Sequence, residues 1–117
     1  EIILVDNSSE DKTVETAKQL GAKTFIKGPE RSAQRNYGAE MSSGEIIGFL
    51  DVDMTLSENV ITECLEIFEN NKDVQAVYIP EKIYGNSFFN RVRSFERSFY
   101  DATVIDAVRF FRPNGWF

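Results

Sequence analysis

The chain contains no histidine, a single cysteine and no long apolar run, and each of these absences excludes a class of protein. Without histidine, the Ser-His-Asp and Cys-His schemes of nucleophilic catalysis and all histidine-bearing zinc sites are excluded. Cys64 cannot form an internal disulfide, so cysteine content does not indicate a compartment. No apolar run approaches the roughly 20 residues that cross a bilayer. Basic residues are also few, 13 against 19 acidic ones, and the net charge of −6 argues against a nucleic-acid backbone as the main partner.

What is present is typical of a globular chain. The 117 residues are 42% hydrophobic and 13% aromatic, which is enough for one domain with a modest core. There is no internal repeat, linker or low-complexity segment, so we predict a single domain over residues 1–117. Residues 1–5 already have the pattern of a core strand and residues 115–117 are apolar, and we therefore expect a fragment of a larger protein.

Strand and helix patterns alternate along the first half of the chain. Residues 2–5 predict a strand that ends at Asp6, and residues 12–20 predict a helix that Ser9 or Asp11 caps and Gly21 ends. A strand at 23–26, a helix from 32 to 41 and a strand at 46–50 follow. The apolar residues expected to face the core from the two helices are Val14, Ala17, Leu20, Ala33, Tyr37 and Met41.

The second half continues the alternation. Apolar residues at helical spacing, namely Val60, Ile61, Cys64, Leu65 and Phe68, predict a helix that ends at Asn70 and Asn71. Residues 74–79 predict a strand, residues from 86 to 100 an aromatic helix, and residues 108–111 a further strand. This order predicts an α/β fold of three α/β/α layers around a largely parallel sheet.

Carboxylates follow two of the predicted strands. Asp51 and Asp53 come directly after strand 46–50, and Asp6 occupies the same place after the first strand. The carboxyl ends of parallel strands form the edge where α/β proteins bind ligands. In extended chain Asp51 and Asp53 would point the same way and hold one hard divalent cation through oxygen. In the alternative, structural interpretation, the acids cap the following helices and Arg31 and Arg35 pair with surface acids.

Three segments in this order, residues 2–13, 31–39 and 44–53, resemble the inverting family-2 glycosyltransferases, whose domain has the Rossmann-like GT-A fold. The resemblance covers about the first 55 residues. It implies a nucleotide-diphosphate sugar donor, UDP- or GDP-linked, and a saccharide or lipid-linked acceptor of the kind used in cell-envelope polysaccharides. It also implies a cytoplasmic location, at the inner face of the membrane where the acceptor is lipid-linked.

The resemblance further implies roles for individual residues. Asp6 would bind the nucleotide base, Asp51 would lie near the ribose and pyrophosphate, and Asp53, with Asp51, would hold a manganese or magnesium ion that bridges the phosphates. Arg31 and Arg35 fall where the family places groups near the nucleotide. The family's catalytic base is a carboxylate much further along its chain, so no catalytic residue is assigned here, and we expect a donor-binding part without turnover of its own.

Two other functions fit parts of the sequence. The segment 51–55 also matches the Asp-x-Asp-x-Thr signature of haloacid-dehalogenase-like phosphatases, in which Asp51 would be the nucleophile. That alternative leaves Asp6 and the arginines unexplained. A module that binds nucleotide sugars without catalysis is the second alternative.

The aromatic helix also has two interpretations. Either its aromatic face packs in the core or under a missing part of the domain, or it meets a membrane surface or a partner while its arginines contact anionic headgroups. The residues of this face are Phe88, Phe89, Val92, Phe95, Phe99 and Tyr100, and the charged residues beside them are Arg91, Arg93, Glu96 and Arg97.

Overall fold

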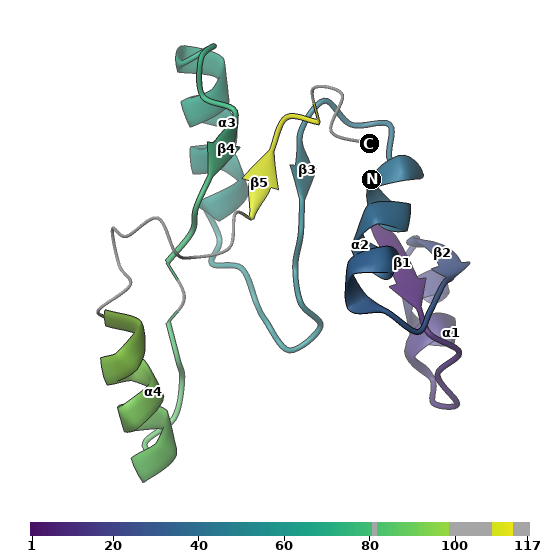
Figure 1. Cartoon of the computed structure of the whole chain (residues 1–117), viewed down its shortest axis with the longest axis horizontal. Coiled ribbons are helices and arrows are strands. Elements are labelled where there is room, and N and C mark those ends of the chain that lie inside the picture. Colours follow the sequence, from purple (N-terminus) through teal and green to yellow (C-terminus); the bar gives the residue numbers. More distant parts are fainter. Residues whose placement is uncertain (81, 99–108, 114–117) are drawn as a thin grey trace. The chain divides into compact units, whose positions relative to one another are not determined.

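Strands and helices alternate along the chain, as the sequence predicts (Figure 1). The computed structural model describes residues 1–80, 82–98 and 109–113. The elements are β1 (Ile3–Asp6), α1 (Thr13–Gln19), β2 (Lys23–Ile26), α2 (Arg31–Glu40), β3 (Ile47–Gly48), α3 (Val60–Asn70), β4 (Ala76–Val77), α4 (Phe88–Ser98) and β5 (Phe110–Phe111). They group into two units, one of Glu1–Phe49 with the segment from Arg112, the other of Leu50–Phe111.

The first unit is built on a parallel strand pair. β1 and β2 align from Ile3 opposite Lys23 to Asp6 opposite Ile26, with α1 as the connection between them. The N-cap of α1 is Lys12, without a side-chain cap hydrogen bond, so the predicted cap at Ser9 or Asp11 is wrong, although the Asp11 carboxylate accepts a hydrogen bond from the Thr13 N–H at 2.9 Å in the first turn. The predicted parallel pairing of an α/β sheet is confirmed here.

Gly21 ends α1 as predicted. Its φ of +85° lies in the left-handed region that glycine adopts without strain. The Gly21 N–H donates to the Lys18 carbonyl and the Ala22 N–H to the Ala17 carbonyl, which is the Schellman arrangement. Leu20, however, is 77% exposed, so its predicted place on the buried face is wrong. The helix proper ends one residue earlier, and Leu20 is its C-cap.

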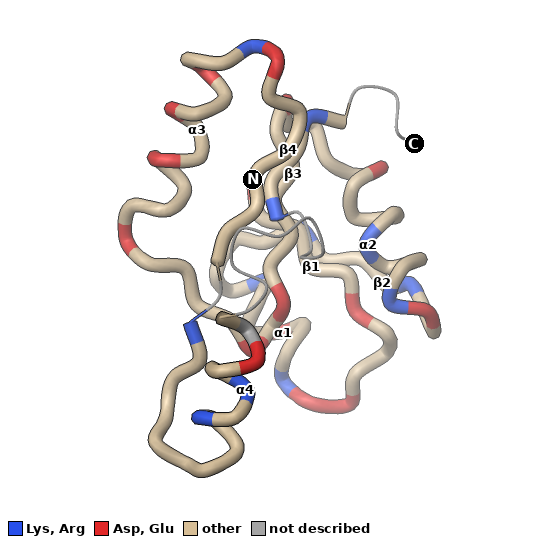
Figure 2. The backbone as a smooth tube through the Cα atoms, turned by 60° about the vertical axis from the view of Figure 1, so that its left-hand side comes forward, with Lys and Arg blue, Asp and Glu red and all other residues tan. Residues whose placement is uncertain are grey.

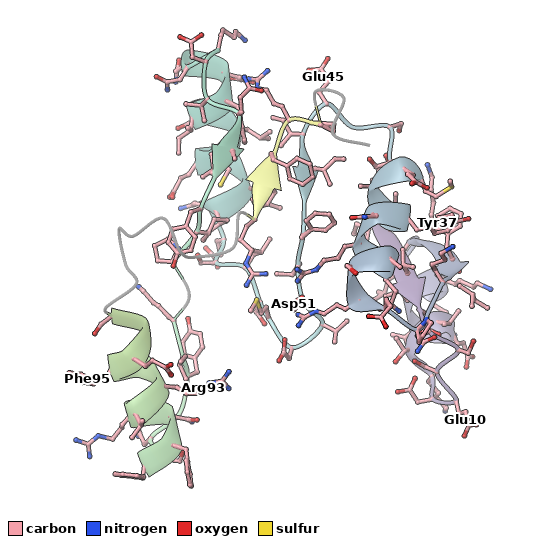
Figure 3. All side chains as sticks on the ribbon, viewed as in Figure 1. Glu10, Tyr37, Glu45, Asp51, Arg93 and Phe95 are labelled. Atoms are coloured by element: carbon pink, nitrogen blue, oxygen red, sulfur yellow. The ribbon has the colours of Figure 1, made fainter. Side chains whose placement is uncertain are left out.

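Helix α2 packs on β1 through small residues. A β-carbon at Gly38 would lie 3.1 Å from Cγ2 of Val5, so glycine permits this close approach. Tyr37 packs edge-on against Phe25 of β2, with ring centroids 5.8 Å apart (Figure 3). The predicted core position at Met41 is wrong, because Met41 follows the helix and is exposed, whereas Ala39 is buried.

An acidic side chain ties the start of the chain to two other segments. The Glu1 carboxylate accepts hydrogen bonds from Nζ of Lys23 at 2.6 Å and from the N–H and hydroxyl of Ser43 at 2.6 and 2.9 Å. The Lys23 ammonium, followed by the Ser43 donors, lowers the pKa of Glu1 from 4.5 to about 2. The carboxylate therefore stays ionised in the folded unit down to strongly acidic pH.

The core of the second unit centres on α3. Cys64 and Phe68 are buried, as predicted, and burial raises the pKa of the Cys64 thiol. Ile61 and Leu65 are 50% and 42% exposed, so the described residues bury a narrower stripe of α3 than the five predicted positions. Acidic residues recur along this helix (Figure 2), and Glu63, Glu66 and Glu69 are exposed.

Two short strands complete the second unit. β4 is only two residues long, where the sequence predicted residues 74–79, and it pairs with β5 in antiparallel direction, with Ala76 opposite Phe111 and Val77 opposite Phe110. Antiparallel strands are common additions to parallel α/β sheets. The predicted strand at 108–111 is confirmed at Phe110 and Phe111, and residue 108 lies outside the described residues.

Helix α4 exposes its aromatic residues. Phe88, Phe89 and Phe95 are 74%, 77% and 68% exposed, so these three rings are not buried among the residues that the structure describes. Figure 3 shows Phe95 and Arg93 on opposite sides of α4. Phe99 and Tyr100 lie outside the described residues. Within the described part of the chain, no helix combines the length and the apolar character that spanning a bilayer requires.

Candidate functional site

Residues 51–54 form a turn that follows the third strand. The Met54 N–H donates to the Asp51 carbonyl at 3.0 Å, so the two acids are not in extended chain as the sequence predicted. The preceding strand is also shorter than the predicted 46–50, since it covers Ile47–Gly48 and Leu50 is 50% exposed. The backbone reverses direction in this turn, so the alignment of the two carboxylates that an extended chain would give is not expected here.

Asp51 and Asp53 have different surroundings within this turn. The Asp51 carboxylate accepts from Nη1 of Arg109 at 3.4 Å, and the two side chains are only 19% and 11% exposed. Asp53 is exposed to solvent. In this turn the Asp51 carboxylate (labelled in Figure 3) is therefore paired with the Arg109 guanidinium, whereas the Asp53 carboxylate is exposed to water.

Arg109 is the residue that sequence reasoning missed. It lies 58 positions from Asp51 in a stretch predicted only as an apolar strand. Arginine is rarely buried unless it is paired, so an arginine inside an apolar strand pattern was the available signal for a buried ion pair. Its partner could not be read from the sequence, because nothing local connects the two segments.

The acids of the turn fit a magnesium or manganese ion only in a limited way. In the described residues there is no group of three or more Asp, Glu, Cys or His that could hold a metal. Magnesium is commonly bound through one or two carboxylates, with water and substrate phosphates as the remaining ligands. Asp53, alone or with Asp51, satisfies that smaller requirement.

Asp6 ends β1 in a different setting. It is 6% exposed, and its carboxylate accepts from the Ser9 N–H at 2.7 Å and from the Ser9 hydroxyl at 2.6 Å. Ser8 between them has a φ of +57°, which closes the loop tightly. An ionised carboxylate has about four acceptor positions, so these two bonds leave capacity for another donor.

The arginines of α2 belong to the same unit as Asp6. Arg31 and Arg35 are four residues apart on the helix and so share a face. Arg31 is exposed, and the Arg35 guanidinium lies over the Phe49 ring, 5.7 Å from its centroid. Each unit thus gathers part of the predicted set: Asp6, Arg31 and Arg35 in one, Asp51 and Asp53 with Arg109 in the other. The predicted common edge for all of them stays a prediction.

Comparison with known proteins identifies the family. The sequence model of glycosyl transferase family 2 matches residues 1–114. A dolichol-phosphate mannosyltransferase of Pyrococcus furiosus is 29% identical over 80 residues, which cover 63% of this chain and 23% of that protein. A protein of Rickettsia typhi named as an uncharacterized glycosyltransferase is 36% identical over 81 residues, 67% of this chain and 27% of that protein. No solved structure gives a significant match.

The matched segments span about a quarter of the length of these two relatives. The family match extends the resemblance seen in residues 2–53 to nearly the whole chain, and the alternation of strands and helices agrees with part of the predicted GT-A fold. This chain belongs to glycosyl transferase family 2.

Proposed function

We propose that the protein to which this chain belongs transfers a sugar from a nucleotide-diphosphate donor, UDP- or GDP-linked, to a saccharide or lipid-linked acceptor, with the help of a divalent cation. Family membership supports the transferase class. The observation that carries the donor site is the turn at 51–54, in which Asp51 is anchored by Arg109 while Asp53 stays exposed.

The proposed roles follow from the surroundings of each residue. Asp53 would hold a manganese or magnesium ion, with Asp51 beside it toward the ribose and pyrophosphate. When bound, such a cation neutralises the negative charge that develops on the departing diphosphate. Asp6, whose carboxylate keeps acceptor capacity beyond Ser9, would accept a hydrogen bond from the base.

Arg31 and Arg35 would add positive charge near the nucleotide. Both lie on one face of α2, and the stacking of Arg35 on Phe49 limits the orientations of its guanidinium. A guanidinium presents several donors in a fixed plane, which suits phosphate oxygens.

The phosphatase alternative is less well supported. Its nucleophile would be Asp51. The Arg109 guanidinium contacts one oxygen of that carboxylate and stabilises its negative charge, which makes it a weaker nucleophile. The family match also favours the transferase.

A titration of the full-length protein tests the donor site. We expect UDP or GDP to bind with measurable heat only when manganese is present. The Asp53→Asn variant should lose this manganese-dependent binding. Glu58→Gln, which removes a nearby exposed carboxylate, is the matched control and should bind like wild type. Folded wild-type protein that gives no heat with either nucleotide would refute the donor site. Binding without release of nucleotide from a donor sugar would instead indicate the non-catalytic module.

The acceptor side of the proposal concerns α4 and the inner face of the membrane. The apolar residues Phe88, Val92 and Phe95 recur at i, i+4 and i+7 on one exposed stripe, with Arg91 at its border and Arg93 on the opposite side of the helix. In a chain of net charge −6, α4 carries three arginines and one glutamate (Figure 2). Such a helix suits an anionic lipid surface, where a lipid-linked acceptor would be found.

Liposome flotation of the full-length protein tests this placement. Wild type should float with vesicles that contain anionic phosphatidylglycerol, and less with neutral phosphatidylcholine vesicles. Phe88→Ser with Phe95→Ser should abolish flotation, while Ile61→Ser, an equally apolar change at an exposed position of α3, should leave it unchanged. No flotation of wild type at low salt would mean that another part of the protein or a second copy covers α4, and would refute the lipid contact.

A further inference from the structure

Arg109 is a charged residue in a place where charge is costly. It is 9% exposed overall, and its side chain is 11% exposed. A buried guanidinium is tolerated when its charge is matched, and the Asp51 carboxylate at 3.4 Å supplies a matching charge. The contact joins positions 58 residues apart, so it is a product of the tertiary structure.

The backbone of Arg109 is itself fixed by strand pairing. Its N–H donates to the Val77 carbonyl at 3.2 Å, and the next two residues, Phe110 and Phe111, pair with β4. Phe111 is 8% exposed and belongs to the core of the unit. The guanidinium therefore extends from an anchored position, and it can restrain the carboxylate that it contacts.

Asp51 is the first residue of the turn that presents Asp53. Its carbonyl closes the turn with Met54, and its side chain is held by Arg109. Restraint at both points limits how the turn can rotate. One of the two acids is thus paired with an arginine of the protein, and the other is exposed to solvent.

We propose that Arg109 is a positioning residue of the donor site, which rests on the proposed function. Its guanidinium holds the Asp51 carboxylate in one orientation, and it offsets the repulsion between the two acids and the pyrophosphate of the donor. Loss of Arg109 makes the surroundings of the two acids more negative by one charge. Loss of Arg109 should then strengthen binding of manganese alone and weaken binding of the anionic nucleotide.

Because the affinities for manganese and for the nucleotide should change in opposite directions, the two measurements distinguish a positioning role from a structural one. A variant that merely loosens the fold weakens both ligands together. Arg109→Met removes the charge and keeps an extended side chain, and we expect it to bind UDP with manganese on the order of 10-fold more weakly, while manganese alone binds as well as wild type or better. Arg109→Lys keeps the positive charge but replaces the planar guanidinium with a compact ammonium group, so it should recover part of the lost UDP affinity.

The experiment uses the full-length protein and titrates manganese alone, then UDP and GDP at saturating manganese, for wild type, both Arg109 variants and Arg93→Met. Arg93 is exposed on α4 and serves as the matched loss of an arginine. The double variant Arg109→Met with Asp51→Asn removes both charges, so it keeps the measurement possible if the single variant does not fold. Measured beside Asp51→Asn alone, it should bind UDP about as well as that variant, because Arg109 acts through Asp51.

Nucleotide binding by Arg109→Met equal to that of wild type would overturn the positioning role and leave the proposed function standing. Parallel weakening of manganese and nucleotide without recovery in Arg109→Lys would also overturn it, in favour of a structural role. Absence of nucleotide binding by folded wild type would instead overturn the proposed function, and the role of Arg109 with it.

Discussion

The loop after β1 allows a quantitative prediction about Asp6. The Ser9→Ala variant removes the hydroxyl that donates to Asp6 Oδ1 at 2.6 Å but leaves the Ser9 N–H bond to Oδ2 at 2.7 Å. Hydrogen bonds to charged groups contribute about 1.5–3 kcal/mol. Because Asp6 is 6% exposed, water has little access to replace the lost donor. We therefore expect the free energy of unfolding of this unit to fall by about 2 kcal/mol.

A matched control lies in the same unit. The Ser42 hydroxyl donates to the Ala39 carbonyl at 2.8 Å, which is a neutral acceptor. The Ser42→Ala variant should cost only about 1 kcal/mol, because bonds between neutral groups contribute about half as much. The difference between the two variants isolates the charge of Asp6 from the general effect of deleting a serine hydroxyl.

Urea unfolding of the full-length protein, followed by a probe in the first unit, measures both variants. The midpoint should fall further for Ser9→Ala than for Ser42→Ala at an unchanged slope. If Asp6 also binds the base, Ser9→Ala should weaken UDP binding as well, whereas Ser42→Ala should not. Equal losses of stability in the two variants would mean that the hydrogen bond from the Ser9 hydroxyl to the Asp6 carboxylate is no stronger than a bond between neutral groups, and would refute this prediction.

Three further predictions concern stability. Phe68→Ala should destabilise the second unit by about 3–5 kcal/mol in urea unfolding because Phe68 is fully buried, whereas Ile67→Ala, at a position 40% exposed, should cost clearly less; equal losses would contradict the burial. Gly21→Ala should lower the thermal midpoint, at a cost of about 1 kcal/mol, because its φ is +85°, and Gly21→Asn should lower it less. Glu1→Gln should reduce stability at pH 7 because the folded pKa of Glu1 is lowered to about 2, and its difference from wild type should vanish as pH falls from 4.5 toward 2; a constant difference in acid titration would contradict the Lys23 contact.

Much of the local structure could be predicted because its causes are local. β2 covers the predicted residues 23–26, β1 ends at Asp6, and α1 stops at Gly21, since strand propensity and the left-handed glycine act within a few residues. Family membership could be predicted for a similar reason. Three short segments in a fixed order carry the resemblance, and their order is a property of the sequence alone.

The sequence by itself therefore determined the α/β alternation, most element positions and the family. Only the tertiary structure decided which apolar residues are buried, so that Phe68 is enclosed while Leu20 and Ile61 are exposed. The turn at residues 51–54 and the contact between Arg109 and the Asp51 carboxylate are likewise visible only in the tertiary structure. The physical reason is range: helix caps and strand patterns depend on neighbours a few positions away, whereas burial and ion pairs depend on segments that meet only when the chain folds.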